Sequence, residues 1–308
     1  MENPYKNRDI LSTRDFSKKE IDFLIDQARK MENLITDGSS ALSNKILASV
    51  FLEPSTRTRL SFDAAMKNLG GKVIGFSDWE KSSFKKGETM SDTLRVVENY
   101  ADIIVIRSKY EGAAKYASEI LNIPIINAGS GSQEHPTQAF LDLMCMKEEK
   151  NGLDGINIGL CGDLKYGRTV HSLLPLLAFY NVNLKLISPE SLKIRTEDKV
   201  FLDERGVKYE EMEPLESIID QLDILYMTRI QRERFPSDEE FLKVQGYYIL
   251  NKQMLAKASK DIIIMHPLPR INEIEPTIDT MSQAVYFKQP KYGLYLRMAL
   301  LGLIFDVL

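Results

Sequence analysis

Short apolar runs alternate along the chain with stretches whose apolar residues recur at helical spacing. The runs have the length and β-branched content of buried strands, and they lie at residues 46–52, 72–76, 103–106, 124–127, 156–161, 182–187, 224–227 and 262–265. The first helical stripe follows a capping-box sequence at 17–20 and consists of Ile21, Leu24, Ile25, Ala28 and Met31. Further helices are expected at 88–100, 111–121 and 167–180. Alternating strands and helices predict parallel sheets with helices on both faces.

The alternation is interrupted by a stretch of small residues at 128–132 and restarts after it. We therefore expect two α/β domains in tandem. The final apolar stretch, 292–307, is predicted to be a helix that returns to the first domain. The expected division places residues 1–134 and 291–308 in the first domain and 135–290 in the second.

The junction between the first apolar run and the next helix, Glu53–Phe62, combines hydroxyls and arginines. Ser55 or Thr56 can cap this helix, whose N-terminal amides and partial positive charge attract anions. Arg57 and Arg59 add guanidinium groups suited to phosphate. Such crowding is unusual for an ordinary capped helix, so the junction predicts a phosphate cradle. Beside the other candidate residues of the chain, however, Arg59 lies further along the helix and is expected to be structural. The apolar face of the helix is expected to consist of Leu60, Ala64, Ala65 and Leu69.

Polar side chains follow several of the other predicted strands, and ligands of open parallel sheets bind beyond the carboxyl ends of strands. The residues concerned are Arg107, the segment 135–138, the segment 162–169, Arg229 with Gln231, and the segment 266–270. Arginines recur in this set, which predicts a positively charged cleft for a polyanion.

Each of these residues also has a simpler interpretation. Arg107 taken alone is typical of a surface position, and His135 alone could equally be a loop histidine. His171 lies within a predicted helix and is expected to be structural. Segment 162–167 lacks the G-x-G-x-x-G spacing, which argues against a dinucleotide cofactor.

Composition narrows the classes of function. The chain has 308 residues, 44% of them hydrophobic, and a net charge of −4, which argues against nucleic-acid binding. Cys145 and Cys161 are expected to be buried free thiols, and three histidines in all show no metal-ligand spacing, so neither a metal nor a cofactor is expected. The polar N-terminus and the lack of a long apolar span predict a soluble, cytoplasmic protein without a membrane segment.

The motifs carry a resemblance over nearly the whole chain. Ser55–Arg59 is similar to the carbamoyl-phosphate signature of the aspartate/ornithine carbamoyltransferase family, and His135–Gln138 resembles its second motif. Segments 162–173, 229–234 and 266–270 resemble the aspartate branch of that family. The ornithine branch carries a cysteine in the last motif, where this chain has Pro267.

The resemblance implies the family's fold and reaction. The fold would be two parallel-sheet α/β domains, one for carbamoyl phosphate and one for aspartate. The reaction would transfer the carbamoyl group to the α-amino group of L-aspartate, giving N-carbamoyl-L-aspartate and phosphate, in de novo pyrimidine biosynthesis. The family further implies a homotrimer with active sites shared between subunits, and some members add a zinc-bearing regulatory chain.

Roles for individual residues follow from the same motifs. Thr58, Arg107 and His135 would donate hydrogen bonds to the carbonyl oxygen of carbamoyl phosphate. Lys86 is the fourth residue expected to be catalytic. Carbamoyl phosphate would be bound by Ser55, Thr56, Arg57, Thr58, Arg107, His135, Gln138, Ser82, Pro267 and Leu268. Adjacent Ser83 could take the place of Ser82. The carboxylates of aspartate would be bound with the help of Lys86, Arg168, Arg229 and Gln231.

Glu53 needs a separate explanation, because a carboxylate in a phosphate cradle repels its ligand unless it is paired. We expect it to engage Arg168 or Arg234 across the domain gap and to favour domain closure. Two alternatives remain at this point. A carbamoyltransferase for ornithine is disfavoured because a cationic side chain would meet Arg229. A non-catalytic anion-binding homologue would usually have lost one of the key residues, all of which are present.

Overall fold

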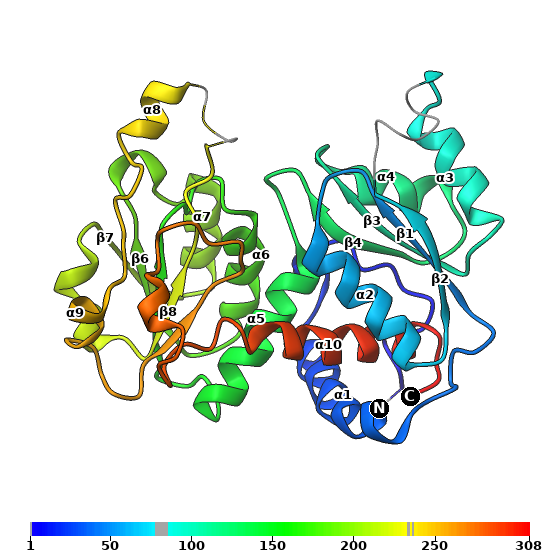
Figure 1. Ribbon diagram of the computed structural model, residues 1–308, viewed down its shortest axis with the longest axis horizontal. Coiled ribbons are helices and arrows are strands. Elements are labelled where there is room, and N and C mark those ends of the chain that lie inside the picture. Colours follow the sequence, from blue (N-terminus) through cyan, green and yellow to red (C-terminus); the bar gives the residue numbers. More distant parts are fainter. Residues whose placement is uncertain (1, 78–85, 233–234, 236) are drawn as a thin grey trace. The chain divides into compact units, whose positions relative to one another are not determined.

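The computed structural model describes residues 2–77, 86–232, 235 and 237–308. It divides into two compact units, Met1–Leu141 with Pro290–Leu308, and Asp142–Gln289. Each unit contains one parallel sheet with helices packed around it (Figure 1). The fold class expected from the sequence is therefore confirmed, including the return of the C-terminal helix to the first unit.

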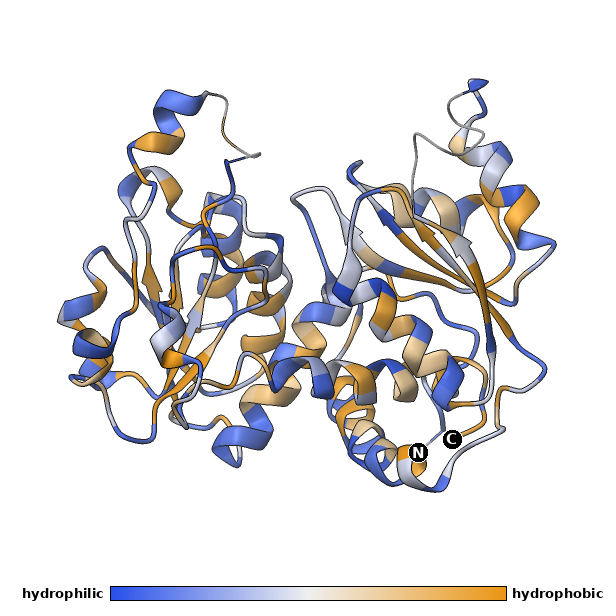
Figure 2. Ribbon diagram, viewed as in Figure 1, coloured by the Kyte–Doolittle hydropathy of each residue, from blue (hydrophilic) through white to orange (hydrophobic). Residues whose placement is uncertain are grey.

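The first unit is built on a four-stranded sheet of order β2-β1-β3-β4. Its strands are β1 (Ile46–Phe51), β2 (Lys72–Phe76), β3 (Ile103–Ser108) and β4 (Ile125–Ser130). Its helices are α1 (Lys18–Asp37), α2 (Thr56–Asn68), α3 (Met90–Glu98), α4 (Ala113–Ile120), the first part of α5 (Pro136–Lys150) and nearly all of α10 (Gln289–Ile304). The central strands β1 and β3 are almost wholly buried, and Figure 2 shows hydrophobic residues concentrated along them.

The second unit is built on a five-stranded sheet of order β7-β6-β5-β8-β9. Its strands are β5 (Asn157–Cys161), β6 (Asn183–Ile187), β7 (Lys208–Met212), β8 (Ile224–Met227) and β9 (Ile263–Met265). Its helices are the rest of α5, α6 (Arg168–Leu177), α7 (Thr196–Glu204), α8 (Asp238–Leu242) and α9 (Lys252–Leu255). Short 3₁₀ turns occur in the two units at Thr13–Asp15, Glu190–Leu192, Leu215–Ser217, Ile219–Gln221 and Pro276–Ile278.

Two expectations about individual elements need correction. Strand β7 was not expected, because its sequence is polar and its residues lie at the edge of the sheet with most side chains exposed. The apolar face predicted for α2 was also partly wrong. Leu60 is 60% exposed, and the buried face instead begins with Thr58 and continues through Phe62. The helix therefore turns a hydroxyl, rather than a leucine, towards the interior.

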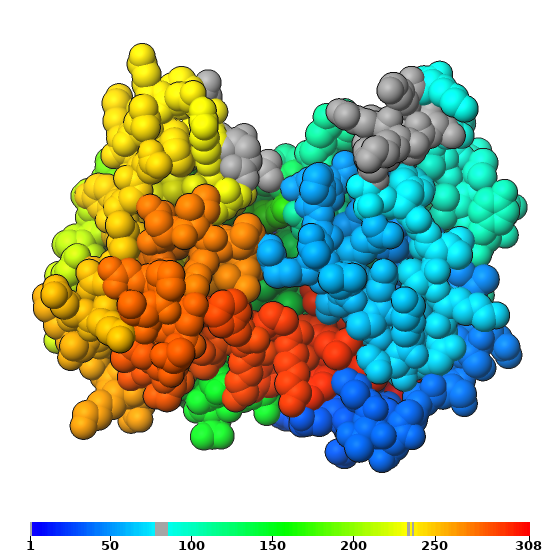
Figure 3. Space-filling view, in the orientation of Figure 1, coloured from blue at the N-terminus to red at the C-terminus, as the bar shows by residue number. Residues whose placement is uncertain are grey.

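The C-terminal helix α10 anchors the two helices that begin at the candidate site, α2 and α5. Arg297 on α10 is 3% exposed and donates to Ser61 Oγ on α2 at 2.8 Å and to Thr137 Oγ1 on α5 at 3.3 Å. Its guanidinium also lies 5.0 Å from the centre of the Phe62 ring. The space-filling view shows α10, in red, directly against α2 (Figure 3). A buried cation thus links the second turn of α2 to the first turn of α5.

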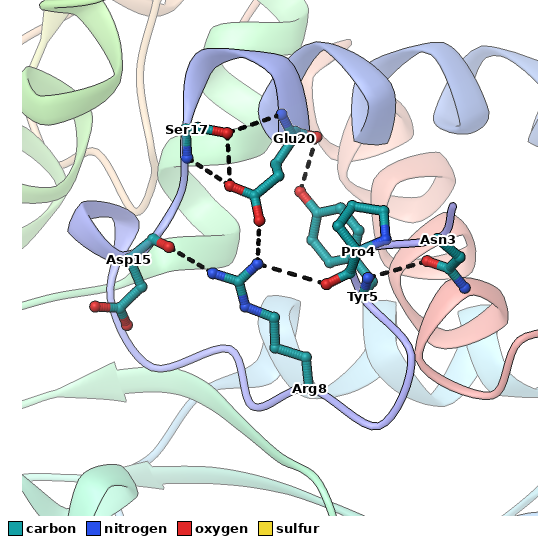
Figure 4. A network of polar contacts seen from close by, with 7 residues as sticks. All are labelled: Asn3, Pro4, Tyr5, Arg8, Asp15, Ser17 and Glu20. Carbon is teal, nitrogen blue, oxygen red and sulfur yellow. Dashed lines mark hydrogen bonds and ion pairs between the residues drawn. The ribbon is translucent and has the colours of Figure 1, made fainter. Parts of the chain in front are cut away.

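The N-terminal segment fixes the start of α1 through a polar network (Figure 4). The Ser17 amide donates to Glu20 Oε2 at 2.7 Å and the Glu20 amide donates to Ser17 Oγ at 3.4 Å, which completes the expected capping box. Arg8 forms an ion pair with Glu20, and the Tyr5 hydroxyl donates to the Glu20 carbonyl at 2.9 Å. Glu20 is the shared acceptor of this network.

A Glu20→Gln variant tests the network through the pH dependence of stability. Burial raises the pKa of Glu20, but the bonds from Ser17 and Arg8 outweigh it, so the pKa lies below its ordinary value of 4.5. The ionised group therefore stabilises the fold above pH 4.5, and the contribution is lost as the pH falls through the lowered pKa. We expect the variant to lose roughly 1 kcal/mol of unfolding free energy at pH 7 and less at acidic pH.

Urea unfolding across the pH range measures this difference. Asp26→Asn on the exposed face of the same helix is the control, and its effect should be small at every pH, because the ion pair of Asp26 with Arg29 is exposed to solvent. A Glu20→Gln difference that stays constant down to acidic pH would rule out the ionic contribution.

Candidate active site

In the first unit, three neighbouring strands deliver the candidate residues to one edge of the sheet. Phe51 at the end of β1 pairs in register with Arg107 of β3, and Ser108 of β3 pairs with Ser130 of β4. The segments that follow β1 and β4 therefore begin on either side of Arg107. The register thus brings the candidate segments of three strands to neighbouring positions, and their sharing of one site stays a prediction.

The junction after β1 has the form expected of an anion site. Ser55 occupies the N-cap position of α2, and its side chain makes no capping hydrogen bond to the helix. Thr56 and Arg57 are exposed in the first helical turn. The N-terminal amides of α2 lack carbonyl partners within the helix and point towards the same end. The start of α2 thus has the arrangement of amides and hydroxyls that attracts an anion.

Thr58 and His135 meet in the interior of the first unit. Thr58 Oγ1 lies 3.3 Å from His135 Nε2, and the two residues are 7% and 4% exposed. His135 reaches this position because a tight turn closes after β4, with the Ser130 amide donating to the Glu134 carbonyl at 2.9 Å. The His135 carbonyl then accepts from the Gln138 amide in the first turn of α5. Two motifs separated by nearly eighty residues are thereby brought into direct contact.

Arg107 is a buried cation that already contacts Glu53. Its Nη2 lies 3.2 Å from Glu53 Oε1, and its Nη1 donates to the Ala128 carbonyl at 3.3 Å. The sequence-based expectation named only Arg168 and Arg234 as partners of Glu53, so it was incomplete. Arg107 compensates the carboxylate from within the same unit. A contact of Glu53 with Arg168 stays a prediction, and Arg234 lies outside the described residues.

In the second unit, Thr228 joins the ends of two adjacent strands. Its Oγ1 donates to the Cys161 carbonyl at 3.1 Å and accepts from the Asp163 amide at 3.0 Å. Gly162 between them has a φ of 118°, and a Cβ at this position would lie 2.4 Å from the Thr228 carbonyl oxygen. Only glycine fits this close approach of backbones. The connection fixes where the chain leaves β5 for α6 and where it leaves β8.

The predicted residues of the second unit also lie at neighbouring strand ends. Arg168 is the first residue of α6, which follows β5, and it is half-buried. Half-buried Arg229 and Gln231 follow β8, and half-buried Pro267 and Leu268 follow β9. The sheet order places β8 between β5 and β9, so these three groups start from consecutive strands.

Other candidate residues have structural roles, are exposed, or lie outside the residues that the structure describes. His171 is 5% exposed and its Nε2 lies 3.2 Å from the Leu164 carbonyl, which supports the expected structural role. Burial raises the pKa of the Cys161 thiol well above its usual range, so it is not poised as a nucleophile. Lys86 is exposed shortly before α3, and Ser82 and Ser83 fall outside the described residues.

Within the described part of the chain, no group of three or more His, Cys, Asp or Glu side chains could hold a metal ion. The helices of that part include none that is both long and apolar enough to cross a membrane. Both free cysteines are buried, as expected from the sequence.

Several contacts that support the site were not expected from the sequence. They involve Arg297 and the buried pair of His266 and Glu273, whose side chains are 2.8 Å apart. His266 belongs to a recognised motif, but its partner lies in a segment without a distinctive pattern. Arg297 lies in an apolar helix, where an arginine among apolar residues is the signal that the sequence offers.

Two parallel α/β units with cationic side chains at their strand ends define a two-domain protein that binds anionic ligands. Family models agree in detail. Residues 8–148 match the carbamoyl-P binding domain of aspartate/ornithine carbamoyltransferase, and residues 154–304 match its Asp/Orn binding domain. The chain belongs to the aspartate/ornithine carbamoyltransferase family.

Individual relatives are similar over their full length. The chain is 53% identical over 306 residues to the aspartate carbamoyltransferase catalytic subunit of Thermococcus kodakarensis, with 99% of both chains covered. It is 48% identical to the catalytic subunit of aspartate transcarbamoylase from M. jannaschii, with a TM-score of 0.90 over 97% of this chain and 98% of that one. The Trypanosoma cruzi enzyme in complex with carbamoyl phosphate and aspartate is 38% identical, with a TM-score of 0.93 and 97% of both chains covered.

Proposed function

We propose that this protein is an aspartate carbamoyltransferase that transfers the carbamoyl group of carbamoyl phosphate to the α-amino group of L-aspartate. The observation that carries the proposal is the buried contact between Thr58 and His135 in the unit where buried Arg107 lies at the neighbouring strand end, next to the N-terminus of α2. The full-length similarity to enzymes named for this reaction supports the choice of aspartate. The products would be N-carbamoyl-L-aspartate and phosphate, as used in pyrimidine biosynthesis.

Carbamoyl phosphate binding falls mainly to the first unit. The phosphate oxygens would be bound by Ser55, Thr56 and Arg57 together with the amides at the start of α2. Ser82 or Ser83, supplied by a neighbouring subunit, would add a further donor. The carbamoyl NH₂ group would donate to Gln138 and to the carbonyl oxygens of Pro267 and Leu268, which follow β9.

The chemistry requires stabilisation of a developing oxyanion rather than a covalent intermediate. As the amine attacks, the carbonyl oxygen of carbamoyl phosphate gains negative charge in a tetrahedral transition state. Thr58, Arg107 and His135 would donate to that oxygen, and each such donor lowers the barrier by roughly 3 kcal/mol. The leaving phosphate can accept the proton of the amine. The protein therefore contributes positioning and fixed electrostatics.

Aspartate binding falls mainly to the second unit. Arg168, Arg229 and Gln231 would bind the two carboxylates, with Lys86 as a further cation. Glu53 and Arg234 are assigned to domain closure. Arg107 gives Glu53 an additional function, because the carboxylate accepts from the guanidinium at 3.2 Å and restrains its orientation.

The assay that tests this function compares amine substrates directly. The purified chain is incubated with carbamoyl phosphate and either L-aspartate or ornithine, and the carbamoylated amine is measured. We expect product with aspartate and none with ornithine, because the cationic ornithine side chain would face Arg229. Product with ornithine alone would favour the other branch of the family, and no product with either would favour a non-catalytic homologue.

We also propose a cytoplasmic homotrimer in which Lys86 and Ser82 complete the site of a neighbouring subunit. The relatives' description as catalytic subunits supports assembly with other chains, and a zinc-bearing regulatory chain is one candidate partner. The proposal is tested by mixing two inactive variants, Lys86→Ala and Arg57→Ala, after dissociating them.

Random reassembly should restore about a quarter of the wild-type activity, because one site in four then combines two intact contributors. Each variant dissociated and reassembled alone is the control and should stay inactive. Mixed trimers that are demonstrated by mass but remain inactive would exclude sites shared between subunits.

A further inference from the structure

The loop that follows β9, residues 266–273, is built around a buried acid–imidazole pair. His266 is 1% exposed and Glu273 is 7% exposed. His266 Nε2 lies 2.8 Å from Glu273 Oε1. A pair of this kind is costly to bury unless its remaining polar atoms are also satisfied, so the other bonds of the two side chains show what the pair holds in place.

The second nitrogen of the imidazole binds the backbone of the loop. The Leu268 amide donates to His266 Nδ1 at 2.8 Å. Because Nδ1 accepts this bond, it carries no proton, and the proton of the neutral ring resides on Nε2, which donates to Glu273. The two bonds together therefore select one tautomer of His266.

The carboxylate binds the other end of the same loop. Glu273 Oε2 accepts from the amides of Ile271 and Asn272 at 3.0 and 3.1 Å. Burial raises the pKa of Glu273, but the bonds from His266 and from the Ile271 amide outweigh it and lower the pKa, so the group is an ionised acceptor. The His266 amide in turn donates to Gln289 Oε1 at 2.8 Å. The loop is thus fixed at its start, at Leu268 and near its end.

Leu268 needs the hydrogen bond to His266 because its backbone conformation is unfavourable. Its φ is 52°, in the left-handed region that a leucine rarely occupies. A residue persists there only when its surroundings impose the conformation, and such residues are frequent at functional sites. The Leu268 amide bonded to His266 is a specific contact that imposes it, and the conformation sets the direction of the adjoining carbonyl groups.

We infer that His266 and Glu273 are positioning residues that aim the carbonyl oxygens of Pro267 and Leu268 at the carbamoyl NH₂ group. The inference rests on the proposed function, which assigns those carbonyls to carbamoyl phosphate. His266 itself acts only through the backbone of Leu268. Its contribution is to orient the carbamoyl group for attack, so it should appear in kcat rather than in folding alone.

Two substitutions of His266 separate the roles of its two ring nitrogens. In His266→Asn the amide oxygen lies near the position of Nδ1 and can still accept from Leu268, but the side chain is too short to reach Glu273. In His266→Gln the amide nitrogen lies near the position of Nε2 and can still donate to Glu273, but the Leu268 amide loses its acceptor. We expect kcat at saturating substrates to fall about tenfold in the Gln variant and to stay within about threefold of wild type in the Asn variant.

Thermal unfolding is measured on the same samples, because a purely structural role would lower Tm in both variants without separating their kcat values. Equal kcat in the two folded variants would overturn the inference. If neither His266 variant folds, the Glu273→Gln variant tests the inference instead. Its single amide oxygen cannot serve both His266 and the two backbone amides, so kcat should fall, and an unchanged kcat would overturn the inference. Failure of all three variants to fold would assign the pair to the core alone and reject the positioning role.

An Arg107→Ala variant assayed in parallel separates this inference from the proposed function. If that variant keeps wild-type turnover, the site assignment itself fails, whatever the His266 variants do. If it loses turnover while the Asn and Gln variants of His266 are indistinguishable, only the positioning role fails.

Discussion

Replacing Arg107 with alanine is expected to lower kcat/KM by about a thousandfold or more. The change removes a donor to the developing oxyanion, an effect that alone reaches 10²- to 10³-fold in comparable sites. It also removes the cation that lies 3.2 Å from Glu53 Oε1 and so leaves a less compensated carboxylate beside the phosphate cradle. Steady-state kinetics with both substrates varied gives the measurement.

The control is Arg59→Ala, because Arg59 is a cation of the Ser55–Arg59 motif in the same unit that is expected to be structural and has no assigned contact with a ligand. Its kcat/KM should stay within about threefold of wild type. A double variant isolates the contribution of the Glu53 carboxylate. Glu53→Gln combined with Arg107→Ala should bind carbamoyl phosphate more tightly than Arg107→Ala alone, because the uncompensated negative charge is removed. If Arg107→Ala retained more than a tenth of the wild-type kcat/KM, its place in the oxyanion site would be untenable.

Replacing Arg229 with alanine is expected to raise the KM for aspartate about a hundredfold and to leave the affinity for carbamoyl phosphate unchanged. A guanidinium–carboxylate contact with two parallel hydrogen bonds is among the stronger polar interactions, and its loss leaves a substrate carboxylate without a partner. A raised KM for aspartate with unchanged affinity for carbamoyl phosphate would therefore assign Arg229, in the second unit, to aspartate binding.

Arg232→Ala is the control from the same segment. Arg232 is exposed and forms a surface ion pair with Asp238 at 2.8 Å, which contributes little to stability or function. Its KM for aspartate should match that of wild type. A rise in KM of similar size in both variants would indicate general damage to the segment and contradict a specific role for Arg229.

Much of the fold could be predicted because buried parallel strands have simple sequence signals. Runs such as 46–52 and 103–106 are apolar on both faces, and the observed strands β1 and β3 match them closely. Strand β7 was missed because an edge strand of polar residues lacks that signal. The order of strands in each sheet was not predicted either, since it depends on packing between distant segments.

The individual site residues could be identified from motifs, whereas their contacts could not. The motif around Thr58 gave no indication that its hydroxyl would lie 3.3 Å from His135 Nε2. The expected face of α2 was wrong for Leu60 because apolar spacing was given more weight than the inward position of a threonine. Likewise, the pairing of Glu53 with Arg107 follows from the register of β1 and β3, which a linear sequence does not display.

The central claim is that carbamoyl phosphate is bound mainly by residues of the first unit, Arg107 among them, and aspartate mainly by residues of the second, including Arg229. Calorimetric titration of carbamoyl phosphate into wild type, Arg107→Ala and Arg229→Ala tests it most directly, because no turnover is required. We predict that binding weakens by about a hundredfold or more in Arg107→Ala and is unchanged in Arg229→Ala. Unchanged binding in Arg107→Ala, or equal weakening in both variants, would contradict the claim.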